Sequence, residues 1–166
     1  MGVGEMGEIW VKGDAVSTGY WNQPEATAAA YTDGWFHMGD LATKDAEGFI
    51  TIVDRKNDMI ISGGLNVYPR EVEDVISAHP AVRELAVIGV PDEKWGEAVT
   101  ACVALAPGAS LELDELQAHC KKEGLASYKK PLRLEIVDEV PKTAVGKLFR
   151  RGLREKYWVG EGRRVG

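Results

Sequence analysis

The sequence predicts an α+β protein in which a small mixed sheet flanked by helices follows a β-rich segment. Two observations support this fold class. In the second part of the chain, short apolar runs of strand length and helix-periodic segments follow one another in the order β-β-α-β-β-α-β-α. The first part holds short strands and turns but few long apolar elements. We therefore expect two domains, a β-rich segment at 1–54 and a compact domain at 55–166.

The first part is expected to contain short strands and one short helix. Residues 8–12 alternate between apolar and polar side chains, as a half-buried strand does. The segment from Pro24 to Tyr31 predicts a brief helix, because proline suits the first turn and three consecutive alanines are strong helix formers. Further strands should begin at Trp35 and cover 49–53, with a hairpin-like turn at 45–48 before the second of them.

The second part has more regular elements. A helix should open at Pro69 and close at His79-Pro80, and Phe149, Leu153 and Tyr157 are spaced as the apolar stripe of a last, basic helix. A third helix is expected around Leu113 to Cys120, and residues 160–166 form a tail that we expect to be frayed. The predicted strands are 59–62, 65–68, 82–90, 98–105 and 132–137.

Composition excludes several classes of protein. The 166 residues are 45% apolar and 28% charged, which is the balance of a globular protein. A net charge of −6 argues against general nucleic-acid binding. Apolar runs are of strand length, far below the ~18 residues of a membrane span, and we find no targeting segment. Cys102 and Cys120 match no disulfide framework or zinc pattern, so we expect two buried thiols in a reducing, cytoplasmic compartment.

Basic residues concentrate near the end of the chain. Residues 142–156 carry a net charge of +5, whereas the rest of the chain carries −11. The commonest meaning of such a run is a solvated helix face. A positive end on an acidic protein also suits a phosphate ligand, and composition leaves both interpretations open.

Two clusters contain candidate binding residues. The segment GWFHMGD ends on Asp40, whose carboxylate can accept hydrogen bonds from vicinal hydroxyls such as those of a ribose; the alternative is an aspartate in a turn. The charged, turn-rich segment 54–58, followed by 59–69, lies between the fragmentary first part and the compact second part, which is where a hinge would fall. The glycine pair, Gly63 and Gly64, either lets the backbone approach a ligand closely or forms a tight hairpin with positive φ.

A third cluster, PKTAVGK at 141–147, ends on Lys147 in a glycine-containing loop before the last helix. A lysine in this position can reach a phosphate or a carboxylate as a mobile point charge. The segment lacks the pattern of a Walker loop. The alternative is that Lys147 is one more lysine in a basic run.

Taken in order, these clusters resemble the carboxyl-terminal part of the adenylate-forming enzymes, which include acyl-CoA synthetases, peptide-synthetase adenylation domains and beetle luciferases. The resemblance covers residues 4 to about 157. Within the family, the segment SGGLNVYPREVE is most similar to acyl- or aryl-CoA ligases. The motifs that carry the resemblance are GEIWVKGDAVSTGYWNQPEAT, DGWFHMGD, DRKNDMIISGGLNVYPREVEDVI, GVPDEKWGEAV and PKTAVGKLFRR. It implies a mobile lid domain preceded by the β-rich end of a large N-terminal domain.

The resemblance also implies a two-step reaction. A carboxylic acid attacks the α-phosphate of ATP to give an acyl-adenylate and pyrophosphate, and the thiol of CoA then displaces AMP. A small carboxyl-terminal domain rotates between the two steps. ATP and CoA are therefore the expected substrates, and Mg²⁺ is expected in the parent enzyme although the residue that binds it has no counterpart in this chain.

The resemblance assigns roles to individual residues. It implies that Asp40 and Arg55 hold the ribose of ATP, and that Asn57 is the hinge, where the family usually has a charged residue. Gly63 and Gly64 correspond to the loop that enters the active site for thioester formation. Lys147 corresponds to the adenylation lysine, which bridges the substrate carboxylate and ATP oxygens.

The leading hypothesis is that the chain is a fragment of an acyl-CoA synthetase and is inactive alone, because the phosphate loop, the adenine motif and the acid pocket of the family are absent from these residues. Exposed strand edges in 1–54 would then favour self-association. One alternative is a stand-alone, non-catalytic binding or interaction module with the lid fold. Another is an adenylation domain that loads a carrier protein instead of CoA.

Overall fold

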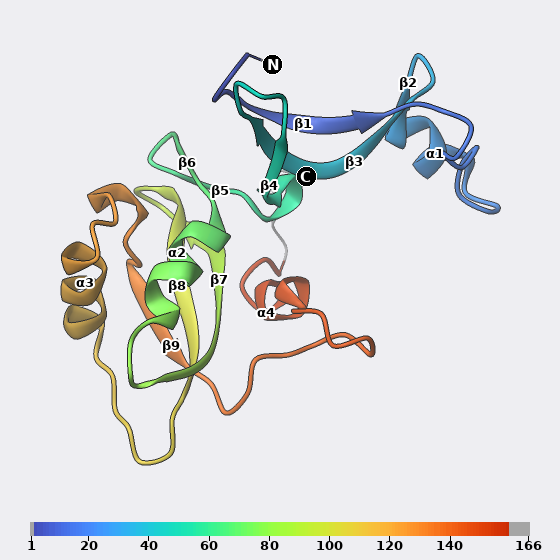
Figure 1. The fold of residues 1–166 in the computed structure, drawn as a ribbon. Helices are drawn as coiled ribbons and strands as arrows, with labels where there is room; N and C mark the ends of the chain where they lie inside the picture. Colours follow the sequence, from blue (N-terminus) through green and yellow to red (C-terminus); the bar gives the residue numbers. More distant parts are fainter. Residues whose placement is uncertain (1, 160–166) are drawn as a thin grey trace. The chain divides into compact units, whose positions relative to one another are not determined.

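The computed structural model of the chain describes residues 2–159, and these form two compact units, one ending at Asn57 and the other beginning at Asp58. Each unit is built around its own sheet (Figure 1). The predicted α+β class is confirmed, and the second unit follows the predicted order of strands and helices from β5 to α4. The tail predicted to fray, 160–166, lies outside the described residues.

The first unit is a four-stranded antiparallel sheet centred on β3. β3 pairs with β1 on one side and with both β2 and β4 on the other. A two-residue turn, Asp33-Gly34, joins β2 to β3 with φ angles of 49° and 79°, which is typical of tight hairpins. Its elements are β1 Met6–Val11, α1 Pro24–Ala30, β2 Tyr31–Thr32, β3 Trp35–Lys44 and β4 Ile50–Arg55.

Strand β2 was not predicted from the sequence. The predicted helix from Pro24 ends at Ala30, one residue early, because Tyr31 pairs with Phe36 of β3 instead of continuing the helix. The ladder with β3 is only two residues long, so no periodic pattern could indicate it.

The first unit has a thin hydrophobic core. Among its described residues, the only buried hydrophobic side chains are Leu41 and Ala42. Phe49, Ile50 and Ile52 are 72%, 57% and 60% exposed. A solvent-exposed sheet that carries several large apolar side chains is typical of a surface that packs against another domain or protein.

We therefore expect the two units to differ in hydrogen exchange. In the isolated chain, amides of residues 1–54 should exchange faster than those of β7 and β8, because few apolar contacts protect the first sheet. If the chain dimerises through the exposed strand edges of residues 1–54, we expect the amides of these residues to be protected from exchange as well. Hydrogen-exchange mass spectrometry at several concentrations tests this, and uniformly high protection of 1–54 in a monomer would contradict it.

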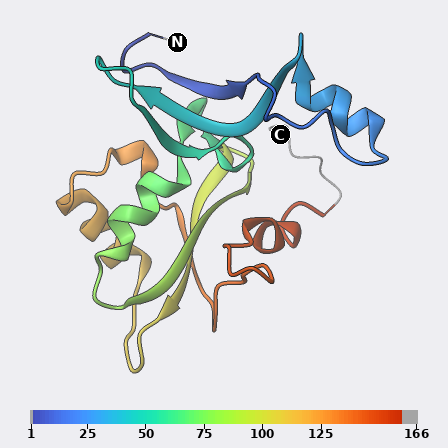
Figure 2. The same cartoon turned by 45° about the vertical axis from the view of Figure 1, so that its right-hand side comes forward.

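The second unit holds a five-stranded mixed sheet in the order β6-β5-β8-β7, with β9 also paired to β8. The β8–β9 ladder is parallel and the other ladders are antiparallel. Helices α2 and α3 cover one face, and α4 lies on the other (Figures 1 and 2). The elements are β5 Ile60–Ser62, β6 Leu65–Val67, α2 Pro69–Ser77, β7 Val82–Asp92, β8 Gly96–Leu105, α3 Leu113–Lys122, β9 Arg133–Ile136 and α4 Arg150–Glu155.

The sheet of the second unit is buried on both faces. Along β8, Val99, Ala101 and Val103 point into the core beneath α2 and α3, whereas Ala98 and Cys102 belong to the core beneath α4. Because successive strand residues point to opposite faces, β8 contributes side chains to both cores. This explains why the sequence shows a continuous apolar run here and not an alternating one.

Two predicted boundaries need correction. The strands predicted at 82–90 and 98–105 are longer, because Asp92 pairs with Gly96 and extends the β7–β8 ladder. Helix α4 ends at Glu155, so Tyr157 lies beyond it, and Phe149 precedes it with its N–H donated to the carbonyl of Pro141 at 2.9 Å. This hydrogen bond ties the residue before α4 to the strand side of the hairpin at Pro141.

Both cysteines are buried, free thiols, as the sequence predicts. Cys102 lies in the core on the α4 side of the sheet and Cys120 in the core on the α2–α3 side. Burial raises the pKa of Cys102 to about 12, so this thiol stays protonated at neutral pH. Within residues 2–159, none of the helices has the length and apolar character needed to cross a membrane.

Candidate functional site

Antiparallel pairing of β3 with β4 places Asp40 opposite Arg55. The Nε atom of Arg55 lies 2.7 Å from Oδ1 of Asp40, and the side chains are 61% and 15% exposed, respectively. The pair presents a carboxylate acceptor and guanidinium donors at one point on the surface. The structure thus brings together the two residues that the resemblance assigns to a ribose, although they are fifteen positions apart.

Asn57 lies in a 3-10 turn, Lys56–Asp58, between β4 and β5. It is exposed and is the last residue of the first unit. The boundary between the two units therefore falls directly after Asn57, the residue that the resemblance assigns to the hinge.

Gly63 and Gly64 form the two-residue turn between β5 and β6, with φ angles of 58° and 79°. These angles fit a tight hairpin, which was one of the two sequence interpretations. A Cβ atom on Gly63 would lie 2.9 Å from the ring of Trp95, whereas one on Gly64 would have no neighbour within 4 Å. Gly63 is thus required by packing, and Gly64 leaves its backbone open to a ligand.

An aromatic groove adjoins this turn, and sequence reasoning did not find it. Its cavity measures about 140 Å³. Ser62 of β5 pairs with Gly96 of β8, which places Trp95 beside the β5–β6 turn. Tyr128 lies on the turn before β9, and the parallel pairing of β9 with β8 brings that turn to the same groove. The groove is lined by Ser62, Gly63, Leu65, Trp95, Ser127, Tyr128 and Leu132.

Two lysines lie next to the aromatic rings of the groove. The ammonium of Lys94 is 4.8 Å from the Trp95 ring centroid, and that of Lys129 is 5.5 Å from the Tyr128 ring centroid. Lys129 also pairs with Glu71 at 2.6 Å. Flat rings beside cations offer stacking and charge together, which suits a heterocyclic base that carries phosphates.

Asp92 orders the turn that carries Trp95. Its Oδ1 atom accepts the N–H groups of Trp95 and Lys94, each at 3.1 Å, and its Oδ2 atom lies 2.9 Å from the guanidinium of Arg133. These bonds, led by that from Trp95, hold the pKa of the Asp92 carboxyl below its ordinary value. The carboxylate is therefore charged at neutral pH and keeps the turn closed.

Lys147 is presented by a short hairpin before α4. Lys142 and Leu148 form an isolated antiparallel bridge, and the N–H of Thr143 donates to the carbonyl of Lys147 at 2.7 Å. The N–H of Lys147 in turn donates to the Thr143 hydroxyl at 3.1 Å. The backbone around Lys147 is thus ordered while its side chain is exposed.

Lys147 differs from the other basic residues of the run 142–156. Each of the others forms an ion pair, whereas the Lys147 ammonium has no ionic partner among residues 2–159. The hairpin of Lys147 lies well away from the β5–β6 turn in both views of the fold (Figures 1 and 2). The paired residues are Lys142, Arg150, Arg151, Arg154 and Lys156.

Comparison with known proteins identifies the family. Residues 71–147 match the AMP-binding enzyme C-terminal domain. Over 98% of its length the chain is 47% identical to a medium/long-chain-fatty-acid–CoA ligase of Mycobacterium tuberculosis, and over 92% it is 52% identical to a long-chain-fatty-acid–CoA ligase of Bacillus subtilis. The chain belongs to the adenylate-forming enzymes. It spans 30% and 27% of the lengths of these two relatives and corresponds to the carboxyl-terminal part of the family.

Solved structures of adenylate-forming enzymes agree with this assignment. ATP-bound MatB of Rhodopseudomonas palustris matches 95% of the chain with a TM-score of 0.87 at 40% identity, the match covering 31% of that protein. The o-succinylbenzoate CoA synthetase of Bacillus subtilis, in complex with its acyl-adenylate intermediate, matches 100% of the chain with a TM-score of 0.83 at 40% identity, over 32% of its length.

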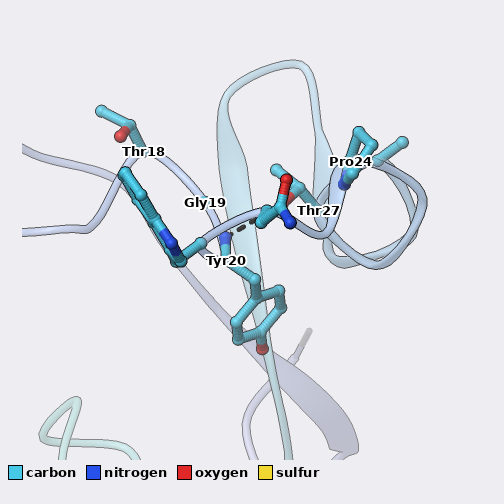
Figure 3. A pocket seen from close by; sticks show the side chains of 8 residues that line it. Thr18, Gly19, Tyr20, Pro24 and Thr27 are labelled. Carbon is cyan, nitrogen blue, oxygen red and sulfur yellow. Dashed lines mark hydrogen bonds between the residues drawn. The ribbon is translucent and has the colours of Figure 1, made fainter.

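One larger hollow lies in the first unit (Figure 3). It measures about 490 Å³ and includes Thr18, Gly19, Tyr20 and Thr27, with the Tyr20 N–H donated to the Thr27 hydroxyl at 2.9 Å. No acid, histidine or basic residue lines it. A Cβ atom on Gly19 would lie 2.5 Å from the Thr27 methyl group, so packing against Thr27 explains why glycine occupies this position.

Proposed function

We propose that the chain is the carboxyl-terminal part of an acyl-CoA synthetase, which converts a carboxylic acid and ATP to an acyl-adenylate and then transfers the acyl group to CoA. The observation that carries the proposal is the state of Lys147. In a run where every other basic side chain is ion-paired, this ammonium alone lacks an ionic partner among the described residues, on an ordered loop. An ammonium held in this way is available to anionic oxygens of a substrate.

In the adenylation step, the carboxylate of the acid attacks the α-phosphate and pyrophosphate leaves. Lys147 would bridge the carboxylate and the ATP oxygens, where its charge stabilises the negative charge that develops in the transition state. Asp40 would accept hydrogen bonds from the ribose hydroxyls, with the adjacent Arg55 orienting them. Within the described residues, no three His, Cys, Asp or Glu side chains lie together so that they could hold a metal ion.

In the thioester step, the CoA thiol attacks the acyl carbonyl and AMP leaves. The open backbone at Gly64 would border the path of the pantetheine arm. The groove of Trp95 and Tyr128 would take the adenine of CoA, with Lys94 near its phosphates. This groove favours CoA over a carrier protein as the acceptor, because the pantetheine of a carrier protein has no adenine to stack.

A hybrid ligase tests the proposal. The matching segment of the Bacillus subtilis ligase, which is 52% identical, is replaced by this chain. We expect the hybrid to form acyl-CoA from a fatty acid, ATP and CoA, while the isolated chain and the truncated ligase do not. A folded hybrid that binds ATP but forms neither acyl-adenylate nor acyl-CoA would contradict the proposal. Full activity with a carrier protein and none with CoA would support the carrier-loading alternative.

A further inference from the structure

We propose that Arg150 and Asp58 form a positioning link that ties the Lys147 loop to the first residue of the second unit. This inference rests on the proposed function, because it concerns how Lys147 is placed for adenylation. Asp58 directly follows Asn57, and Arg150 begins α4, three residues after Lys147. The link therefore joins the candidate hinge to the candidate catalytic loop across 92 positions of sequence.

Arg150 lies between two carboxylates. One of its terminal nitrogens is 3.3 Å from Oδ2 of Asp58, and the other is 2.6 Å from Oε2 of Glu73. Its Nε atom also donates to Oε1 of Glu73 at 3.2 Å, so the contact with Glu73 is bidentate. A guanidinium held by three hydrogen bonds in this way has little freedom to move.

The partners of Arg150 are themselves held in place. Glu73 projects from α2, and its Oε1 atom accepts the N–H of Val87 in β7 at 2.8 Å. Asp58 is held from a second side by Arg154, whose Nη2 atom lies 3.3 Å from Oδ1 of Asp58. The network thus connects α2, β7, α4 and the turn at Asp58 through side chains.

The network is largely shielded from solvent. Asp58, Glu73, Arg150 and Arg154 are only 17%, 12%, 15% and 15% exposed. Among these four side chains, two carboxylates balance two guanidinium groups. Water and salt screen such pairs much less than pairs on the surface, and loss of one member leaves a poorly solvated charge.

Helix α4 depends on such contacts for its position. It has six residues, which is far below the length at which a helix is stable by itself, and Leu153 is its only buried residue. Leu153 anchors the helix in the core beneath it, and the Arg150 and Arg154 ion pairs fix the helix from its polar side. Because Lys147 is followed closely by Arg150, displacement of the guanidinium would displace the lysine loop as well.

The link has different consequences for the two half-reactions. Adenylation needs the Lys147 ammonium in contact with reacting oxygens, so a shift of about 1 Å can lower its rate 10- to 100-fold. Thioester formation is proposed to use the β5–β6 turn, which lies away from α4 (Figures 1 and 2). A defect in the link should therefore appear mainly in adenylation.

The test measures both half-reactions in the hybrid ligase. Asp58→Asn keeps the side-chain shape and leaves Glu73 on Arg150, so we expect a folded protein in which pyrophosphate exchange falls about 10- to 100-fold. Thioester formation from supplied acyl-adenylate should stay within about twofold of the unsubstituted hybrid. Arg150→Lys, which keeps the charge but loses the bidentate fork, should give an intermediate loss.

Arg151→Gln is the matched control, because Arg151 is 78% exposed and its one ion pair within residues 2–159 is with Glu155 on the same short helix. It should leave both half-reactions unchanged. Equal losses in the two half-reactions of Asp58→Asn would overturn the inference and reduce the network to a structural role, and so would unchanged pyrophosphate exchange. Activity of the unsubstituted hybrid tests the proposed function separately, so the two failures are distinguishable.

Discussion

Lys147→Ala in the hybrid ligase is expected to lower the rate of acyl-adenylate formation by about 10²–10³, the range seen when one preorganised donor to a developing charge is removed. Thioester formation from supplied acyl-adenylate should be nearly unaffected, because the lysine is proposed to contact oxygens only in the adenylation pose. The structure supports a direct role, since the Lys147 ammonium forms no ion pair with any residue from 2 to 159 that would be lost instead. Pyrophosphate exchange and thioester release measure the two steps.

Lys142→Ala is the control for this prediction. Lys142 lies in the same hairpin, but its ammonium is 3.0 Å from Oε1 of Glu84. That hydrogen bond is the main reason why the pKa of the Glu84 carboxyl lies below its ordinary value, so the pair is formed at neutral pH. Lys142→Ala should impair adenylation less severely than Lys147→Ala if the position of Lys147 is what counts. Equal loss from both substitutions would mean that the net charge of the hairpin determines the rate of adenylation, and Lys147 would then be one more surface lysine.

Asn57→Pro is expected to slow one half-reaction at least tenfold more than the other. Proline fixes φ near −65° and also restricts the residue before it, so a torsion that must change during rotation becomes locked. Asn57 is the last residue of the first unit, which makes its torsions the natural place for that change. Single-turnover measurements of adenylation and of thioester formation give the two rates.

Asn57→Ala distinguishes the torsion from the side chain. Alanine keeps the backbone freedom of the position, so both half-reactions should remain close to those of the unsubstituted hybrid. If Asn57→Pro is as active as Asn57→Ala in both steps, the hinge lies elsewhere. If alanine is as damaging as proline, the interactions of the Asn57 side chain matter more than rotation.

The second unit carries both candidate sites on one sheet. The groove near Trp95 borders the β5–β6 turn, and Lys147 precedes α4 on the other face of that sheet. A change of pose could therefore exchange the two sites without any rearrangement inside the unit. The positioning link at Asp58 would be the point where a torsional change at Asn57 is transmitted to α4.

Most elements could be predicted from the sequence because their signals are local. Pro69 marks the start of α2, and the glycine pair at 63–64 marks the turn between β5 and β6. Element ends were less accurate where long-range pairing overrides local preference. Tyr31 left its predicted helix to pair with β3, and Asp92 joined the ladder with Gly96.

The candidate site residues could likewise be predicted in part from the sequence and in part only from the structure. Asp40, Arg55, Asn57 and Lys147 could be singled out because residues of the right chemistry stand in the right order along the chain. Their placement in the active site, and the roles assigned to them, remain proposals. What the structure adds is their local state, namely the pairing of Asp40 with Arg55 and the absence of an ionic partner for Lys147 among the described residues.

Sequence order and residue type were enough to establish the α+β class, the succession of elements and the family resemblance, since these depend on periodicity, turn residues and motif spacing. The groove of Trp95 and Tyr128 and the link from Asp58 to Arg150 became visible only in the folded chain. The physical reason is separation: these residues lie dozens of positions apart, and no local preference encodes which of them meet. Strand register and the packing of α2 and α4 on the sheet determine those contacts.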